Sequence, residues 1–211
     1  MPSFEFEDQF EGLVVGIDEA GRGPWAGPVV AGAVVFLSKN IDTYLIDNLN
    51  DSKKLSAKKR ETLYEKIMEA KDKGDLLVGI GLSSAEEIDN HNILQATFMA
   101  MCRAVENLGQ KPNYALVDGN QKPKGLNCEC STIVKGDARS YSISAASIVA
   151  KVFRDRLMCD LAKQYPYYGF EKNAGYGTKS HVEGLNKYGA VKGVHRESYK
   201  PIQEFLVENA A

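Results

Sequence analysis

The sequence predicts an α/β fold, in which a mixed or mostly parallel β-sheet carries helices on both faces. Short runs rich in Val, Ile and Ala alternate with longer segments of helical periodicity, as in sheets covered by helices. The 211 residues suffice for one large core, and 44% hydrophobic with 26% charged residues is an ordinary globular composition. Beyond Pro166 the chain becomes rich in glycine and tyrosine. We therefore expect a body over residues 1–165 and a small C-terminal helical appendage over 166–211, acting as one functional unit.

Five apolar runs are expected to form the strands. The first two, residues 13–17 and 29–37, bracket a turn rich in glycine and proline, which predicts that they are neighbours in the sheet. The other three runs cover residues 76–80, 114–117 and 132–134.

Helical segments lie between and after these strands. Ser56, Ser83 or Ser84, and Asn92 are expected to cap the first three helices, because their side-chain oxygens can accept hydrogen bonds from free backbone N–H groups. The expected helices cover about residues 57–70, 85–88, 93–108, 144–164, 179–188 and 199–207.

Charge is distributed unevenly along the chain. A formal net charge of −2 argues against a protein that coats nucleic acid electrostatically. Basic side chains nevertheless gather in two segments, and such runs are usually solvated surface. The first segment holds Lys53, Lys54, Lys58, Lys59 and Arg60, and the second holds Lys187, Lys192, His195, Arg196 and Lys200.

The sequence also predicts a cytoplasmic protein with reduced thiols. The longest near-apolar run, residues 28–37, is too short to cross a bilayer, and the acidic N-terminus lacks the order of a secretion signal. The four cysteines are Cys102, Cys128, Cys130 and Cys159. Only the pair at 128 and 130 is close, and no second ligand pair accompanies it, so free thiols are expected rather than zinc ligands or a disulfide.

Acidic residues stand where three of the predicted strands end: Asp18 with Glu19, Asp118, and Asp137. Ligands gather at strand ends in open α/β sheets, so these carboxylates are expected to converge. Two unit charges about 4 Å apart repel by about 4 kcal/mol at an effective dielectric of about 20, which favours a raised pKa or a bound dication. Oxygen ligands favour Mg²⁺ or Mn²⁺ over zinc.

The adjacent pair carries a geometric condition. Consecutive residues of a regular strand face opposite sides, so Asp18 and Glu19 can share a site only where the strand bends or ends. Gly21 and Gly23 permit such a bend, and with Arg22 they form a turn that a bulky anion could approach.

Other catalytic patterns are missing from the sequence. It contains no Walker A spacing, no Gly-x-Ser-x-Gly elbow and no His-Glu-x-x-His helix. His91, His181 and His195 are scattered along the chain, and we expect surface or local hydrogen-bonding roles for them rather than a triad.

Ten short motifs follow one another between about residues 13 and 201. They are GIDEAGRGP (16–24), AGPVV (26–30), DSKKL (51–55), VDG (117–119), KGD (135–137), SAASIVAKV (144–152), RD (154–155), YYGF (167–170), GYGT (175–178) and HR (195–196). In this order they resemble type 2 ribonuclease H (ribonuclease HII) of bacterial type. The resemblance covers nearly the whole chain.

The resemblance implies a ribonuclease H-like sheet that carries the acids, with the C-terminal helices closing over nucleic acid. It implies that the catalytic, metal-binding residues are Asp18, Glu19, Asp118 and Asp137. Two divalent ions, Mg²⁺ or Mn²⁺, are expected during catalysis, and Lys53 is expected to contact a phosphate. Asp155 follows Arg154 inside a predicted helix, so we interpret it as structural.

The implied activity is an endonuclease that hydrolyses the RNA strand of RNA/DNA hybrids and incises 5′ of ribonucleotides embedded in duplex DNA. It leaves 3′-hydroxyl and 5′-phosphate ends. The backbone of Gly21, Arg22 and Gly23 would sense the 2′-hydroxyl, which distinguishes RNA from DNA. Tyr176 would pack on a sugar at the RNA–DNA junction, with Tyr168 as the alternative.

Two related enzyme types of the same fold and two other functions are distinguished from this interpretation. Type 1 enzymes lack the adjacent acids in this glycine context, and type 3 enzymes carry an N-terminal substrate-binding domain for which 17 residues leave no room. Trp25 and Asn50 depart slightly from the family pattern. A nuclease for DNA junctions and a non-catalytic hybrid-binding module are the alternatives. We expect a monomer, and a packed helix rather than a replication-clamp peptide at residues 202–206.

Overall fold

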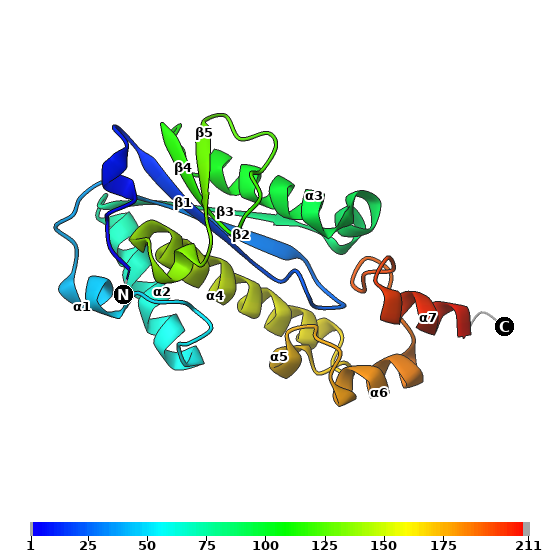
Figure 1. Cartoon of the computed structure of the whole chain (residues 1–211). Coiled ribbons are helices and arrows are strands. Elements are labelled where there is room, and N and C mark those ends of the chain that lie inside the picture. Colours follow the sequence, from blue (N-terminus) through cyan, green and yellow to red (C-terminus); the bar gives the residue numbers. More distant parts are fainter. Residues whose placement is uncertain (1, 209–211) are drawn as a thin grey trace.

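A five-stranded mixed sheet forms the centre of the computed structural model, which describes residues 2–208 (Figure 1). The strands are β1 (Val14–Ala20), β2 (Val29–Phe36), β3 (Leu76–Ser83), β4 (Tyr114–Asp118) and β5 (Glu129–Ile133). Their order is β3-β2-β1-β4-β5, with β1 and β3 antiparallel to β2, and β4 parallel to both β1 and β5. The mixed α/β sheet is thus confirmed, although β5 starts three residues before the predicted run. Residues 1 and 209–211, the ends of the expected body and appendage, lie outside the described residues.

The helices are α1 (Thr43–Asn48), α2 (Ala57–Asp72), α3 (Ala85–Glu106), α4 (Tyr141–Gln164), α5 (Phe170–Asn173), α6 (Lys179–Tyr188) and α7 (Lys200–Glu208). Short 3₁₀ turns, η1 (Glu7–Gln9) and η2 (Gly136–Ala138), complete the described elements. The short helices α1 and α5 were not predicted, because one or two turns carry too little apolar periodicity.

The predicted N-caps are confirmed. Ser56 Oγ accepts a hydrogen bond from the Lys59 N–H at 3.2 Å, and Ser84, rather than Ser83, forms a capping box with Glu87. Asn92 has a φ of 66° and interrupts α3, where its Oδ1 accepts from the N–H groups of the next turn. The two helices predicted here therefore lie end to end across a kink.

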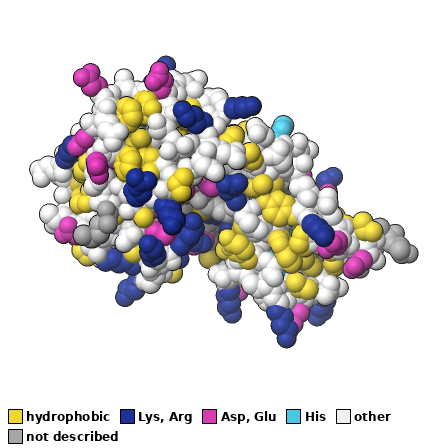
Figure 2. Space-filling view, in the orientation of Figure 1, with side chains coloured by type: hydrophobic (Ala, Val, Ile, Leu, Met, Phe, Trp, Pro, Cys, Tyr) yellow, Lys and Arg dark blue, Asp and Glu magenta, His cyan; other side chains and the backbone are white. Residues whose placement is uncertain are grey.

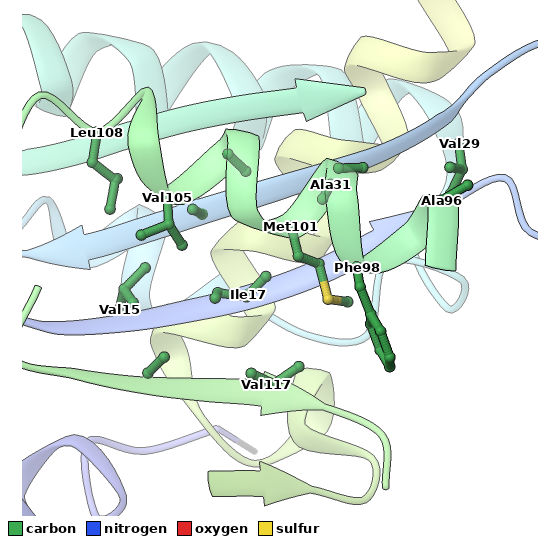
Figure 3. Packing of buried hydrophobic residues seen from close by; sticks show 14 of the residues in the cluster. Val15, Ile17, Val29, Ala31, Ala96, Phe98, Met101, Val105, Leu108 and Val117 are labelled. Atoms are coloured by element: carbon green, nitrogen blue, oxygen red, sulfur yellow. The ribbon is translucent and has the colours of Figure 1, made fainter. Parts of the chain in front are cut away.

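One face of the sheet packs against α3 and forms the larger hydrophobic cluster. Alternate residues of β1 and β2 point to this face, as the period of two in a strand requires. Val15 and Ile17 of β1 lie near Met101 and Val105 of α3, as Figure 3 shows. Because these side chains are buried, the position of α3 over the sheet is set by apolar burial.

The opposite face packs against α2 and α4, and two glycines bring α4 unusually close. A Cβ atom on Gly16 of β1 would lie 2.2 Å from the Ser142 carbonyl carbon, and one on Gly32 of β2 would lie 2.4 Å from the Ala146 carbonyl oxygen. These atoms belong to the α4 backbone, which cannot move aside as a side chain can. The absence of side chains at Gly16 and Gly32 therefore allows the short distance between α4 and the sheet.

We expect Gly16→Ala to lower the free energy of unfolding by about 3 kcal/mol, because α4 must shift to admit the methyl group. Urea denaturation monitored by circular dichroism measures this change. Gly74→Ala is the control: Gly74 has a φ of 82° but no neighbour within 4 Å, so only backbone strain of about 1 kcal/mol applies. An equal loss in both variants would contradict the close-packing argument.

The C-terminal segment wraps around the far end of α4 (Figure 1). Met158 of α4 joins residues of α5, α6 and α7 in a separate hydrophobic cluster, where Ile202 of α7 is fully buried. Residues 202–206 thus form a packed helix, as expected. No helix within residues 2–208 is long and apolar enough to span a membrane.

Candidate active site

Asp18 and Glu19 lie within β1 rather than beyond its end. The pairing of β1 with β2 continues to Ala20, whereas its pairing with β4 stops at Ile17. Asp118 is the last residue of β4, beside this point. The final residues of β1 therefore have a strand partner on one side only, and the sheet edge opens where three acids stand.

The two adjacent acids face opposite sides of the sheet, as the alternation of a strand predicts. Asp18 shares the face of Gly16 and lies near Ser147 of α4, whose hydroxyl donates to Ser52 Oγ at 2.7 Å. Glu19 lies on the other face, in a small hollow lined by residues of α3 and by Asp118. Both carboxylates nevertheless border one cavity of about 620 Å³. The open edge, not the end of the strand, lets them reach a common space.

Asp137 reaches the site from η2, not directly from the end of β5 as predicted. Lys135 adopts a left-handed conformation, with a φ of 57°, and turns the chain after β5. Asp118 Oδ1 accepts a hydrogen bond from the Gly136 N–H at 2.7 Å, which ties this turn to β4. Asp137 is buried and lies near Asp51, an acid that sequence reasoning left out of the site and whose charge raises the pKa of Asp137.

A further residue missed from the sequence supports this turn. Glu7 is buried, and its Oε1 accepts hydrogen bonds from Ser140 Oγ and from Ser142 N and Oγ at the start of α4. The N-terminal segment thereby braces the chain just after Asp137. Nothing local marks Glu7 in the sequence, because its partners lie more than 130 positions away.

The acids perturb one another strongly. Burial raises the pKa of Asp18 well above its usual value, and repulsion from Glu19 and Asp118 raises it further. Burial also raises the pKa of Glu19, although Arg22, 3.4 Å away, opposes this shift. The pKa of Asp137 is raised by burial and by its acidic neighbours. The site therefore holds more negative charge than its surroundings stabilise.

Lys53 supplies part of the missing positive charge. Burial lowers the pKa of its ammonium group, but the carboxylates of Asp18, Asp137, Asp51 and Asp118 outweigh burial and raise it. No three His, Cys, Asp or Glu side chains among the described residues are arranged to hold a metal ion as they stand. The donor set consists of carboxylate oxygens, which suit a hard divalent cation.

The other predicted substrate residues line the same cavity. Gly21, Arg22, Gly23, Lys53 and Tyr176 all border it. In Figure 2 the surface is hollowed between the larger body and the C-terminal part, and Lys and Arg side chains gather beside the hollow. Arginine and lysine at such an opening suit a polyanion.

The two candidate tyrosines differ sharply in exposure. Tyr176 is 51% exposed, whereas Tyr168 is 2% exposed and donates its hydroxyl to the Gly189 carbonyl. The alternative of Tyr168 as a sugar contact is wrong, because its ring belongs to the C-terminal hydrophobic cluster.

Two of the three histidines make local hydrogen bonds, as expected: His181 with the Tyr176 carbonyl and His195 with the Val191 backbone. His181 and His195 are both fully buried, and their Nε2 atoms lie 3.1 Å apart. Burial and the neighbouring His181 lower the pKa of His195 to about 4. His181 Nδ1 contacts the Tyr176 carbonyl at 3.0 Å, so the pair braces the loop that carries Tyr176. His195 and Arg196 are therefore not part of a solvated basic surface.

Two smaller expectations concern Asp155 and the cysteines. Asp155 lies in α4, pairs with Lys151 at 2.7 Å and borders a different cavity, of about 470 Å³, between α2 and α4. All four cysteines are free thiols.

Known proteins resemble this chain along nearly its full length. A family profile described as Ribonuclease HII matches residues 15–202. Ribonuclease HII of Wolbachia sp. subsp. Brugia malayi is 51% identical over 201 residues, which cover 95% of this chain and 94% of the relative.

Solved structures agree with this match. The ribonuclease H2 of Pyrococcus horikoshii OT3 has a TM-score of 0.75 at 31% identity and covers 93% of this chain and 98% of its own. The ribonuclease HII of Archaeoglobus fulgidus, solved in a complex with PCNA, has a TM-score of 0.72 at 26% identity, covering 89% and 96%. The sheet is thus a ribonuclease H fold, and the ribonuclease H family depends on divalent metal ions. The chain belongs to the ribonuclease HII family, whose members are endonucleases that cut the RNA strand of RNA/DNA hybrids.

Proposed function

We propose that this protein also incises duplex DNA on the 5′ side of an embedded ribonucleotide, leaving 3′-hydroxyl and 5′-phosphate ends. One observation carries the proposal. Two of the acids, Asp18 and Glu19, border a single cavity with the glycine turn and an exposed tyrosine, so a phosphate at these acids and a ribose at the turn could be held together. Recognition of one ribonucleotide needs that proximity, because a lone 2′-hydroxyl is the only mark that it carries.

We further propose that Asp18, Glu19, Asp118 and Asp137 hold two divalent cations, Mg²⁺ or Mn²⁺. Support comes from the donor set and from the raised pKa values, which show carboxylates in need of positive charge. Bound cations of this kind activate water and stabilise the leaving oxygen. The carboxylates that interact with the charges of Lys53 and Arg22 would instead bind the ions.

The chain's own groups would orient the substrate. Lys53 would hold a phosphate oxygen, because it borders the cavity and the nearby carboxylates raise the pKa of its ammonium group, which keeps it charged. The backbone of Gly21, Arg22 and Gly23 would contact the ribose. The exposed ring of Tyr176 would pack on the adjoining sugar at the junction.

We propose that the chain works as a monomer without a clamp tether. The PCNA complex concerns the archaeal protein. In this chain the segment 202–206 lies inside α7, and Ile202 is buried in the C-terminal cluster rather than presented to a partner.

The decisive experiment is cleavage of an end-labelled DNA duplex that contains one ribonucleotide. We expect one cut on its 5′ side with Mg²⁺ or Mn²⁺, none with EDTA, and none in an all-DNA duplex. The length and end chemistry of the product identify the cut bond. A protein that cuts only long hybrids would contradict the embedded-ribonucleotide proposal, and one that cuts branched DNA instead would point to a junction nuclease.

A further inference from the structure

Two arginines are buried behind the glycine turn. Arg196 is 0% exposed and Arg154 is 1% exposed. Burying a guanidinium group is costly unless its donors find partners, and burial lowers the pKa of both groups. Among the described residues, their hydrogen-bond acceptors are backbone carbonyl oxygens and one tyrosine hydroxyl, with no carboxylate. Two guanidinium groups that are buried against carbonyl oxygens indicate that they hold the backbone in a particular conformation.

Arg196 hydrogen-bonds directly to the glycine turn, residues 21–23. Its Nη2 donates to the Gly21 carbonyl at 2.6 Å, and its Nη1 donates to the Arg22 carbonyl at 2.9 Å. Its Nε donates to the Gly27 carbonyl at 3.0 Å. The Tyr199 hydroxyl also donates to the Arg22 carbonyl and accepts from Arg196. One planar guanidinium group thus binds two carbonyls of the turn and a third, that of Gly27, in fixed directions.

These bonds also fix the direction of two N–H groups. In a trans peptide the C=O and the following N–H point in opposite directions, and residues 2–208 contain no cis peptide. The carbonyls of Gly21 and Arg22 point toward Arg196, so the N–H groups of Arg22 and Gly23 point away from it. Within the described part of the chain, neither N–H has an acceptor.

The outward side of the turn is the cavity. Gly21, Arg22 and Gly23 line it, and the Cβ position of Gly23 lies 3.4 Å from the ring of Tyr176. Two unpaired donors therefore stand beside the exposed tyrosine. A sugar hydroxyl between the turn and that ring could accept a hydrogen bond from either donor.

We propose that Arg196 is a positioning residue for ribose selection: it holds the two peptide units so that the Arg22 and Gly23 N–H groups meet the substrate 2′-hydroxyl. This role rests on the proposed recognition of ribose by the turn. Arg196 itself does not touch the substrate, because it lies fully buried on the opposite side of the backbone. Lysine cannot replace it, since one ammonium group cannot span three carbonyls in a fixed plane.

The test measures binding preference in an Asp18→Asn background, where cleavage is expected to stop. The readout is the ratio of affinities for a duplex with one ribonucleotide and for the same duplex in all DNA. We expect Arg196→Lys to lower this ratio about tenfold, with the all-DNA affinity unchanged within about twofold. A loss of general folding would lower both affinities together.

Two further variants sharpen the result. Arg154→Lys is the matched control. Arg154 is also almost fully buried, packs against Gly21 and borders the cavity, but it donates to the carbonyls of Ala26, Pro28 and Ala174 and to no carbonyl of residues 21–23; we expect its ratio to be kept. Tyr199→Phe removes one of the two donors to the Arg22 carbonyl, and we expect a drop of about threefold without loss of fold. If Arg196→Lys fails to fold, Tyr199→Phe becomes the test of the proposal. An unchanged ratio of the two affinities in Tyr199→Phe would then overturn it.

The remaining outcomes separate this role from the proposed function. If the Asp18→Asn parent shows no ribose preference, ribose recognition by the turn is wrong and the role of Arg196 falls with it. If the parent prefers ribose and a folded Arg196→Lys keeps that preference, only the positioning role is overturned. An equal loss in Arg154→Lys would also overturn it, in favour of general loosening of the turn.

Discussion

The Asp18→Asn variant is expected to lose at least about a thousandfold of its hybrid-cleaving activity while it still binds the RNA/DNA hybrid. Asp18 borders the cavity from the α4 face, and its negative charge is the property that a cation would need. Asparagine keeps an oxygen that can accept the Glu19 N–H at 2.7 Å, so the local backbone is preserved. Single-turnover cleavage in Mg²⁺ and fluorescence anisotropy of a labelled hybrid measure the two properties.

Stability provides the internal check on this variant. Burial raises the folded-state pKa of Asp18, so its ionised form costs stability above that raised pKa, and the cost is relieved as the pH falls. Removing the charge should leave the melting temperature at pH 7 equal or higher. The lost activity could not then be attributed to unfolding.

The matched control is Asp155→Asn. Asp155 also belongs to one of the ordered motifs, RD (154–155), but it lies in α4 beside a different cavity, and we expect activity within about twofold of the unmodified protein. Turnover retained by Asp18→Asn in Mg²⁺ would remove Asp18 from the catalytic site.

The Tyr176→Ala variant is expected to slow incision at a lone ribonucleotide by about 10- to 100-fold, because it removes an aromatic surface for the substrate. Long hybrids, which offer a ribose at every step, should be affected less. The ring is 51% exposed, so its removal should change the melting temperature little. Rates on both substrates, measured beside thermal melting, give the comparison.

Two other tyrosine variants test the cause of this effect. Tyr176→Phe keeps the ring and should retain most of the activity. Tyr167→Ala removes a ring of similar exposure, 56%, that stacks on Tyr188 and does not border the cavity. If Tyr176→Ala incises the lone ribonucleotide at the unchanged rate, the junction contact belongs to another residue.

Local chemistry explains which parts of the fold were predictable. Ser56, Ser84 and Asn92 mark helix starts because a cap depends on residues only two or three positions away. The apolar runs of the sheet were likewise visible, since side-chain alternation is a local property. The start of β5 was missed because Glu129, Cys130 and Ser131 are polar or only half-buried, and pairing with β4 rather than composition makes them a strand.

The sequence by itself determined the fold class and the three capped helix starts at Ser56, Ser84 and Asn92, and it singled out the four acids as candidates, since each of these signals lies in neighbouring residues or in ordered motifs. It missed the start of α4, which begins at Tyr141 rather than at residue 144. Only the tertiary structure decided which distant side chains and backbone groups contact one another. It buried Arg196 behind the turn, joined His181 to His195, and enclosed Tyr168 while exposing Tyr176. It also opened the sheet edge after Ile17, so that acids on opposite faces share one cavity. These arrangements depend on contacts between residues up to 175 positions apart. Such contacts stabilise the protein only once the chain has folded and the entropy of ordering it has been offset, so no local sequence pattern reveals them.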